Sequence, residues 1–323
     1  MKHRWKRRQP TVDLTPEDVT RILASTGLTC NVTELAQTAT GLVNTVYRVD
    51  IDAPPHRLCL KIGQRGETSA AVEFRATALR QGRDTPQAMS FLPHEPISGH
   101  PCMVFSWVEG IRIDMHAEHL GEDERTRLSF LLGAQLAQIH GSARFGQTGL
   151  LALERDRLTV REPFSLSLAG LHDYATATLR DEVRARVGAA RSEALIQWTG
   201  QHRGGIPASP AVLCHGDYGT ENVLIDRSEQ LWVLDWEFAC SGHPLLDLGH
   251  LLRTPLLAEV PFHDAVAAGY RSEGGILTDD WPRWARVLDL FAWVGFAGRP
   301  HIGPDTLAEV RHRIDRVLTT ESP

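Results

Sequence analysis

The chain has 323 residues, of which 42% are hydrophobic and 23% are charged, so a disordered or fibrous protein is excluded and two domains are expected. Its five cysteines form no Cys-x-x-Cys pair, which argues against a disulfide framework or a zinc ribbon and fits a reducing compartment. No apolar run approaches the roughly 20 residues that a membrane span needs, and the basic N-terminus lacks the apolar segment of a signal peptide. A cytoplasmic protein without a membrane partner is therefore expected.

The net charge of -6 is unevenly distributed. Residues 211–250 hold seven acidic residues and one arginine, whereas residues 1–10 hold five lysines or arginines and no acidic residue. An acidic stretch repels polyphosphates unless a cation neutralises it, and it attracts cationic partners. The basic leader, taken as residues 1–14, is expected to be a solubilising tail without fixed structure, and nucleic acid is not an expected partner.

The first predicted elements are a capped helix and a hairpin. The run Thr-Pro-Glu-Asp at 15–18, followed by spaced apolar residues, predicts a helix start with Thr15 as N-cap, and Gly27 ends this helix. Apolar residues alternate over 43–51, and a β-rich run follows at 57–62. The Asp-Ala-Pro-Pro sequence between these two runs is typical of a turn, so an antiparallel hairpin is predicted.

The next segments complete a small lobe. Residues 70–80 contain no glycine or proline and are rich in helix formers, so they predict a helix. Residues 101–108 predict a buried strand bounded by Pro101 and Gly110. We therefore expect a strand-rich lobe with one main helix over residues 1–108.

The remainder, residues 109–323, is expected to form a larger and mostly helical lobe. Helices are predicted over three segments: 122–140, 165–200, and from 245 to the end. Two short apolar runs at 223–225 and 231–234 are separated by a polar turn and predict a second hairpin.

A spaced set of polar residues surrounds this second hairpin. Asp217 follows His215 and Gly216, Asn222 stands directly before the first strand, and Asp235 closes the second strand. The hairpin brings Asn222 and Asp235 together, with Asp217 at its mouth. Carboxylate and amide oxygens suit Mg²⁺, and phosphoryl transfer needs a metal and a carboxylate that orients the attacking hydroxyl. Two other interpretations stay open: His215 as a buried structural imidazole, or His215 and Asp217 as ligands of a hydrolytic metal.

The whole set resembles the aminoglycoside phosphotransferase and choline kinase superfamily, which is related to the protein kinases. The resemblance rests on His-Gly-Asp-x-x-x-x-Asn, on the strand that ends in Leu-Asp-Trp-Glu, and on the Gly-x-Pro-x-x-Asp-Leu segment, all within residues 211–252. It implies a bilobal protein-kinase-like α+β fold. The small antiparallel-sheet lobe at 1–108 would bind nucleotide, and the helical lobe at 109–323 would carry catalysis and acceptor binding.

The resemblance also implies a nucleotide site in the small lobe. Its expected residues are Gly41 and Asn44 in a glycine-rich-loop segment, Lys61 on the phosphates, Glu73 as the partner of Lys61, and Ser106 and Val108 at the hinge. Lys61 lies in an apolar strand, where an ammonium without a partner is costly to bury. A solvent-facing lysine on an edge strand is the alternative, and Glu67 is a second possible partner. Ser106 leaves ATP versus GTP open.

The implied reaction moves the γ-phosphoryl group of the nucleotide to a hydroxyl. In this scheme Asp217 accepts or orients the hydroxyl proton, Asn222 and Asp235 hold Mg²⁺, and His215 and Asp247 brace the catalytic loop through hydrogen bonds. Each of these roles rests on the resemblance.

The acceptor is the least determined part. The acidity of the second lobe favours a small cationic substrate such as an aminoglycoside-type antibiotic, with Glu237 among its contacts, and this implies a role in antibiotic resistance. Alternatives are a kinase of choline, homoserine or another metabolite, a kinase of Ser/Thr in a natural-product peptide, and a nucleotide-binding pseudokinase. Three late tryptophans, Trp281, Trp284 and Trp293, are expected to be core anchors, with a choline cage as the alternative.

Overall fold

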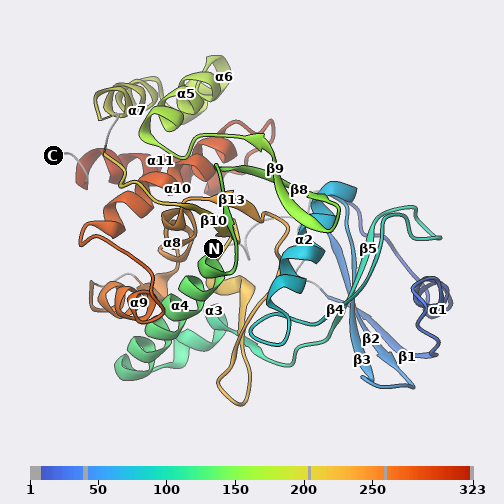
Figure 1. Cartoon of the computed structure of the whole chain (residues 1–323). Helices are drawn as coiled ribbons and strands as arrows, with labels where there is room; N and C mark the ends of the chain where they lie inside the picture. Colours follow the sequence, from blue (N-terminus) through green and yellow to red (C-terminus); the bar gives the residue numbers. More distant parts are fainter. Residues whose placement is uncertain (1–8, 39–42, 203–204, 258–259, 321–323) are drawn as a thin grey trace. The chain divides into compact units, whose positions relative to one another are not determined.

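The computed structural model describes residues 9–38, 43–202, 205–257 and 260–320, and the chain divides into two compact units (Figure 1). Unit 1 consists of Met1–His119, Leu151–Thr159 and Thr220–Ala239. Unit 2 consists of Leu120–Leu150, Val160–Gly219 and Cys240–Pro323. Each unit is therefore assembled from segments that are far apart in the sequence. This division differs from the expected lobes, which were residues 1–108 and residues 109–323.

Unit 1 is built on a five-stranded antiparallel sheet in the order β1-β2-β3-β5-β4 (Figure 1). Its strands are β1 (Val32–Gln37), β2 (Thr45–Ile51), β3 (Arg57–Ile62), β4 (Ala88–Leu92) and β5 (Cys102–Ser106). The β2–β3 hairpin and β5 confirm the predicted strands, whereas the sequence pattern did not predict β1 or β4. Lys61 lies opposite Val46 of β2 and Met103 of β5, so it is on the central strand and not on an edge.

Two helices, α1 (Pro16–Ser25) and α2 (Glu67–Arg80), pack against this sheet. α1 begins at the predicted capping box, in which the Thr15 side chain accepts from the Asp18 N–H and the Asp18 carboxylate accepts from the Thr15 N–H. α2 confirms the second predicted helix and starts earlier. Phe74 of α2 packs against Phe91 and Phe105 of the sheet, which buries this face of the helix.

The described part of the basic leader contacts β2. The Val12 N–H donates to Thr45 Oγ1 at 3.1 Å, and the Leu14 N–H donates to Tyr47 Oη at 3.1 Å. The Leu14 side chain is buried in the core of unit 1. Residues 9–14 are thus part of the fold and not a free tail, because their backbone and apolar side chains have partners on the sheet. Residues 1–8 of the leader lie outside the described residues.

A second sheet in unit 1 joins three short strands. β6 (Ile111–Arg112) pairs with β11 (Val223–Ile225), and β11 pairs with β12 (Leu231–Val233), with Val223 opposite Val233. The Val233 N–H also donates to the Asp84 carbonyl at 2.7 Å. The predicted second hairpin is present, and this long-range pairing makes it part of unit 1. The short helix α3 (Ile113–His116) follows β6.

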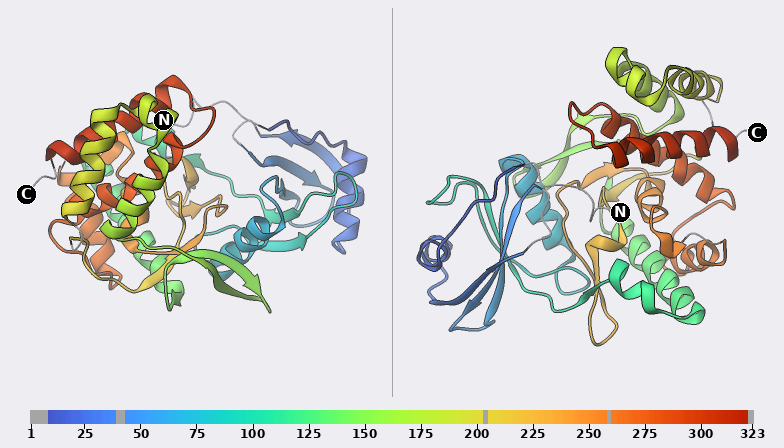
Figure 2. Two further views of the ribbon diagram at one scale, coloured as in Figure 1. Left: turned by 90° about the horizontal axis from the view of Figure 1, so that it is seen from above. Right: turned by 180° about the vertical axis from the view of Figure 1, so that it is seen from behind.

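Unit 2 is mostly helical, as predicted for the later part of the chain. Its helices are α4 (Glu122–Ser142), α5 (Leu168–Thr178), α6 (Asp181–Val187), α7 (Ala189–Gln201), α8 (Pro244–Leu251), α9 (Val260–Ser272), α10 (Trp281–Ala297) and α11 (Pro304–Thr320). α5 packs on α10, and α7 packs on α11 (Figure 2). α4 and α9 pack very closely: a Cβ on Gly133 would lie 2.1 Å from the Val266 carbonyl oxygen, and one on Gly269 would lie 1.9 Å from that of Phe130.

A sheet of short strands runs through unit 2 in the order β7-β10-β13-β8-β9, and sequence patterning did not predict these strands. They are β7 (Arg144–Phe145), β8 (Gly149–Glu154), β9 (Arg157–Pro163), β10 (Ala211–Cys214) and β13 (Cys240–Gly242), with residues 151–159 of the β8–β9 pair assigned to unit 1. β10 is fully buried and leads directly into the His215-Gly216-Asp217 segment.

The three tryptophans of α10 are buried in unit 2. Trp293 Nε1 donates to Asp289 at 2.6 Å, Trp284 Nε1 donates to Asp280 at 2.7 Å, and the Arg253 guanidinium lies 5.0 Å from the centre of the Trp293 ring. The three tryptophans are therefore core anchors, as predicted. The Arg253 guanidinium already covers the Trp293 ring, so this ring is not open to a quaternary ammonium. Across the part of the chain that the structure describes, no helix is both long and apolar enough to cross a membrane.

Candidate active site

Lys61 is a buried ammonium that lies between two carboxylates of unit 1. Its Nζ donates to Glu73 Oε1 at 2.5 Å and to Asp235 Oδ1 at 2.6 Å. Burial alone would lower the pKa of Lys61, but Asp235 and Glu73 outweigh burial and hold that pKa above its ordinary value. The predicted partner Glu73 is therefore in place, and Lys61 is charged. Glu67, the other possible partner, is exposed and lies 3.8 Å from His94.

Glu237 extends this cluster of carboxylates. Asn44 Nδ2 donates to Glu237 Oε2 at 2.6 Å, while Asn44 Oδ1 accepts from the Gln64 N–H at 2.9 Å. Burial, and then the charge of Asp235, raises the pKa of Glu237 to about 7. Burial likewise raises the pKa of Glu73, against the effect of Lys61. Burial is the main cause of both raised pKa values, and the charge of Asp235 adds to each.

The two candidate metal ligands are brought together by the β11–β12 hairpin. Asn222 ends a short 3₁₀ turn (Thr220–Asn222), and its carbonyl accepts from the Leu234 N–H at 2.9 Å, next to Asp235. Asp235 has φ 66°, a left-handed conformation that is unfavourable for a residue with a Cβ. Such backbone strain persists where the surrounding structure enforces it and is common at functional sites.

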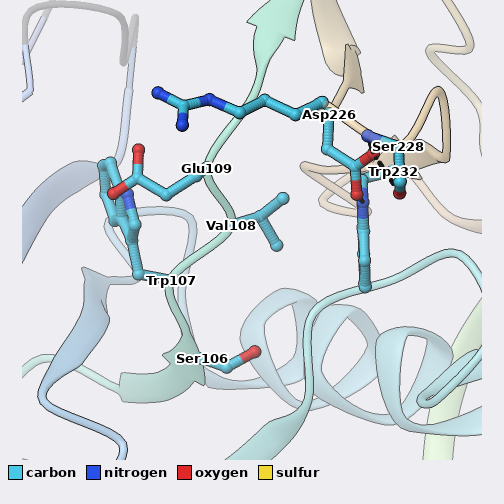
Figure 3. Close-up of a pocket in the computed structure, with 8 residues that line it drawn as sticks. Ser106, Trp107, Val108, Glu109, Asp226, Ser228 and Trp232 are labelled. Atoms are coloured by element: carbon cyan, nitrogen blue, oxygen red, sulfur yellow. Dashed lines mark hydrogen bonds between the residues drawn. The ribbon is translucent and has the colours of Figure 1, made fainter.

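The predicted hinge lines an open pocket of unit 1 (Figure 3). The pocket has a volume of about 400 Å³ and lies between residues 106–109 and the β11–β12 turn with Trp232. Val108 points toward Trp232, whose Nε1 donates to Asp226 Oδ2 at 2.8 Å (Figure 3). Ser228, and then Trp232, lowers the pKa of Asp226 to about 2, so this carboxylate is ionised.

The hinge serine is hydrogen-bonded to Gln87, the residue directly before β4. Ser106 Oγ accepts from the Gln87 N–H at 2.9 Å, and the Ser106 N–H donates to the Gln87 carbonyl at 2.9 Å. These bonds hold the end of β5 in place, and the pocket begins at this residue. The hinge, the Lys61 cluster and both candidate metal ligands thus belong to one compact unit. Gly41, the remaining predicted nucleotide contact, lies outside the described residues.

Asp217 lies in a tight loop of unit 2 that Asp247 holds from behind. The buried Asp247 carboxylate accepts from the His215 N–H at 2.7 Å and from the Gly216 N–H at 2.8 Å. The Asp217 N–H donates to His215 Nδ1 at 3.3 Å, and the Asp217 carbonyl accepts from the Gly219 N–H at 2.8 Å. His215 is fully buried, which fits a structural imidazole better than a ligand of a hydrolytic metal.

Two contacts of the site were not foreseen. The Asn44–Glu237 hydrogen bond joins residues 193 positions apart, and the bond of Asp84 to Val233 ties the turn after α2 to the strand that leads to Asp235. The sequence carries no local signal for either contact, because both depend on which distant segments pack together. The glutamate that follows Asp235-Trp236 was a visible candidate, and the structure places it beside Asn44.

A family model described as "Phosphotransferase enzyme family" matches residues 34–287. Among solved structures, the GDP and kanamycin complex of APH(2")-IIia aligns over 95% of this chain and 100% of its own, with 13% identity and a TM-score of 0.64. A putative aminoglycoside phosphotransferase from Ralstonia eutropha aligns over 95% and 98%, with 14% identity and a TM-score of 0.65. The macrolide 2'-phosphotransferase MphH from Brachybacterium faecium aligns over 95% and 99%, with 19% identity and a TM-score of 0.58. At these identities the structures establish a shared fold, which is the predicted kinase-like α+β fold.

Proposed function

The chain belongs to the phosphotransferase enzyme family, and from this premise we propose that it transfers the γ-phosphoryl group of ATP or GTP to a hydroxyl of a small cationic acceptor. The observation that carries the proposal is the position of Lys61 between Glu73 and Asp235. A buried lysine beside a strained aspartate suits a triphosphate, because the ammonium can neutralise phosphate charge while the aspartate faces a cation.

The donor set of unit 1 fits Mg²⁺. Asn222, Asp235 and Glu237 offer the hard amide and carboxylate oxygens that Mg²⁺ prefers. Burial, and then the negative charge of Asp235, raises the pKa of Glu237 to about 7, and a divalent cation would offset that neighbouring charge. When bound, Mg²⁺ would supply neutralisation of the β- and γ-phosphates. Lys61 would hold the phosphates, and Glu73 would keep the lysine oriented.

Asp217 would act on the acceptor. Its carboxylate would take the proton of the attacking hydroxyl, a role that requires the carboxylate to be held in a fixed direction. Asp247 supplies that direction, because it binds the two N–H groups that precede Asp217. Purine binding is assigned to the hinge pocket, with the Ser106 carbonyl and the Val108 N–H as base contacts and with ATP and GTP both admitted.

For the acceptor, the acidic charge of residues 211–250 and the aminoglycoside named for one structural neighbour favour an aminoglycoside-type antibiotic and a role in resistance. Glu237 was the expected acceptor contact, and its bond to Asn44 favours a role nearer the phosphates. Choline is disfavoured because the α10 tryptophans are buried. A pseudokinase is disfavoured because Lys61, Asp217, Asn222 and Asp235 are all present.

The test measures phosphate transfer from ATP and GTP to a panel of aminoglycosides, macrolides, choline, homoserine and Ser/Thr peptides. Asp217→Asn is expected to lower turnover by about 10²–10⁴-fold while nucleotide affinity stays unchanged, because the nucleotide residues lie in unit 1. Asp123→Asn, which changes an exposed carboxylate of unit 2, is the matched control. Transfer by Asp217→Asn at the wild-type rate, or no transfer to any acceptor, would contradict the proposal.

A further inference from the structure

A chain of buried hydrogen bonds leads from the catalytic loop of unit 2 to Tyr270 on α9. His140, near the end of α4, has its Nε2 3.2 Å from Asp247 Oδ2 and its Nδ1 2.8 Å from the Tyr270 hydroxyl. Asp247 in turn accepts from the N–H groups of His215 and Gly216. Tyr270, His140 and Asp247 are all buried, so these bonds are shielded from water.

Hydrogen-bonding capacity assigns the proton positions for the case in which Asp247 is a carboxylate and His140 is a neutral imidazole. An ionised Asp247 can only accept, so His140 Nε2 must carry the proton that is donated to it. In the neutral imidazole Nδ1 is then an acceptor, and the Tyr270 O–H donates to it. Burial raises the pKa of the Tyr270 hydroxyl, which keeps that proton in place. The direction of donation therefore runs from Tyr270 through His140 to Asp247.

A metal site is the other interpretation of this cluster, since ligand atoms of His140, Cys214 and Asp247 lie within 4.8 Å of one another. However, both ring nitrogens of His140 and both oxygens of Asp247 already have hydrogen-bond partners. Burial also raises the pKa of the Cys214 thiol well above its ordinary value, which opposes the thiolate that a metal needs. The contacts fit a hydrogen-bond relay better.

We propose that Tyr270 and His140 are positioning residues for phosphoryl transfer, acting through Asp247 on the loop that carries Asp217. The proposal rests on the role assigned to Asp217 above. A buried carboxylate with three N–H donors has one favoured orientation, and loss of the His140 donor would leave only the two backbone donors to hold it. The anchor of the relay is rigid, because the close approach of α4 and α9 at Gly133 and Gly269 fixes Tyr270 relative to His140.

The test compares four purified variants of the full chain. His140→Leu removes the donor to Asp247 and is expected to lower kcat by about 10–100-fold, the usual cost of losing a group that orients a catalytic one. His140→Gln places an amide N–H near the position of Nε2 and should recover most of that loss. Tyr270→Phe removes a single hydroxyl and should lower kcat less than His140→Leu. Nucleotide affinity should be unchanged in all three.

His263→Leu is the matched control for a merely structural role. It removes a buried histidine from α9 whose Nε2 lies 2.7 Å from the Leu257 carbonyl oxygen, away from the relay. It should lower the melting temperature about as much as His140→Leu but leave kcat unchanged. Equal kcat in His263→Leu and His140→Leu would overturn the proposal.

Hydrogen exchange at the His215 and Gly216 amides provides a readout that does not need turnover. Both amides should exchange faster in His140→Leu and Tyr270→Phe than in the wild type or His263→Leu, because their acceptor is no longer held. Unchanged exchange would overturn the relay even if kcat fell. Faster exchange in His140→Leu and Tyr270→Phe, combined with a wild type that phosphorylates no acceptor, would support the relay and contradict the proposed function. If His140→Leu does not fold, Tyr270→Phe decides the question by the same measurements.

Discussion

The two units hold their key aspartates in different ways. In unit 1 a charged lysine holds Asp235, whose side chain is 40% exposed and lies among other carboxylates. In unit 2, N–H donors hold Asp247, whose side chain is fully buried. A charge pair at a partly open position can exchange its partner for a metal or a phosphate. A carboxylate surrounded by fixed N–H groups cannot, and it suits a permanent brace.

The largest effect should come from removing the buried ammonium of Lys61 in unit 1. Lys61→Met leaves the buried Glu73 without its partner, which is expected to cost about 3–5 kcal/mol in the free energy of unfolding and to abolish nucleotide binding. The double variant Lys61→Met/Glu73→Leu should regain most of the stability, because it removes the unpaired Glu73 carboxylate. It should regain no nucleotide binding, because it does not replace the ammonium. Urea unfolding and nucleotide titration check both statements. A stable Lys61→Met protein would show that the ion pair does not hold unit 1.

Glu237 of unit 1 and His243 of unit 2 should contribute to the pH dependence of stability in opposite directions. In unit 1, the pKa of Glu237 is about 7, against an ordinary value of 4.5, mainly because of burial and then Asp235. The folded state therefore binds more protons than the unfolded state between these values, and stability falls as the pH rises through them. In unit 2, burial lowers the pKa of His243 below its ordinary value of 6.5. The unfolded state then binds more protons below pH 6.5, so stability is lost as the pH falls.

Two variants separate these contributions, each measured against the wild type by urea unfolding from pH 4.5 to 8. Glu237→Gln keeps an acceptor for Asn44. Above pH 7 it should raise the free energy of unfolding by on the order of 1–3 kcal/mol relative to the wild type, and at pH 4.5 it should not change it. His243→Asn keeps an acceptor for the Leu245 N–H at the start of α8 and should reduce the loss below pH 6.5. If both variants changed the pH dependence of the unfolding free energy in the same direction, the contrast between Glu237 and His243 would be wrong.

The smallest effect should come from the capping box of α1. Thr15→Ala removes the acceptor for the Asp18 N–H and is expected to cost about 1 kcal/mol of unfolding free energy without changing turnover. Thr20→Ala is the matched control, because its exposed hydroxyl bonds only to a carbonyl of its own helix, that of Pro16. An equal effect of the two variants would show that the cap does not stabilise unit 1.

Sequence analysis missed strands for two different physical reasons. β1 and β4 are the two edges of the five-stranded sheet, and neither shows the alternation of buried and partly buried residues that makes β2 recognisable. β10 and β13 have four and three residues, too few to show a period. The assignment of residues 220–239 to unit 1 was missed because it depends on the pairing of β11 with β6.

The sequence alone determined the capped start of α1 and the β2–β3 hairpin. It also determined that the polar residues from His215 to Asp235 surround a second hairpin. Each of these features depends on residues that are near one another in the chain. The tertiary structure decided which groups meet. It selected Glu73 over Glu67 for Lys61, since only the buried side of α2 faces the central strand. It also joined His140 to Tyr270, 130 residues further along, since α4 and α9 pack in contact. Such contacts depend on the packing of whole helices and strands, which a spacing of residues does not encode.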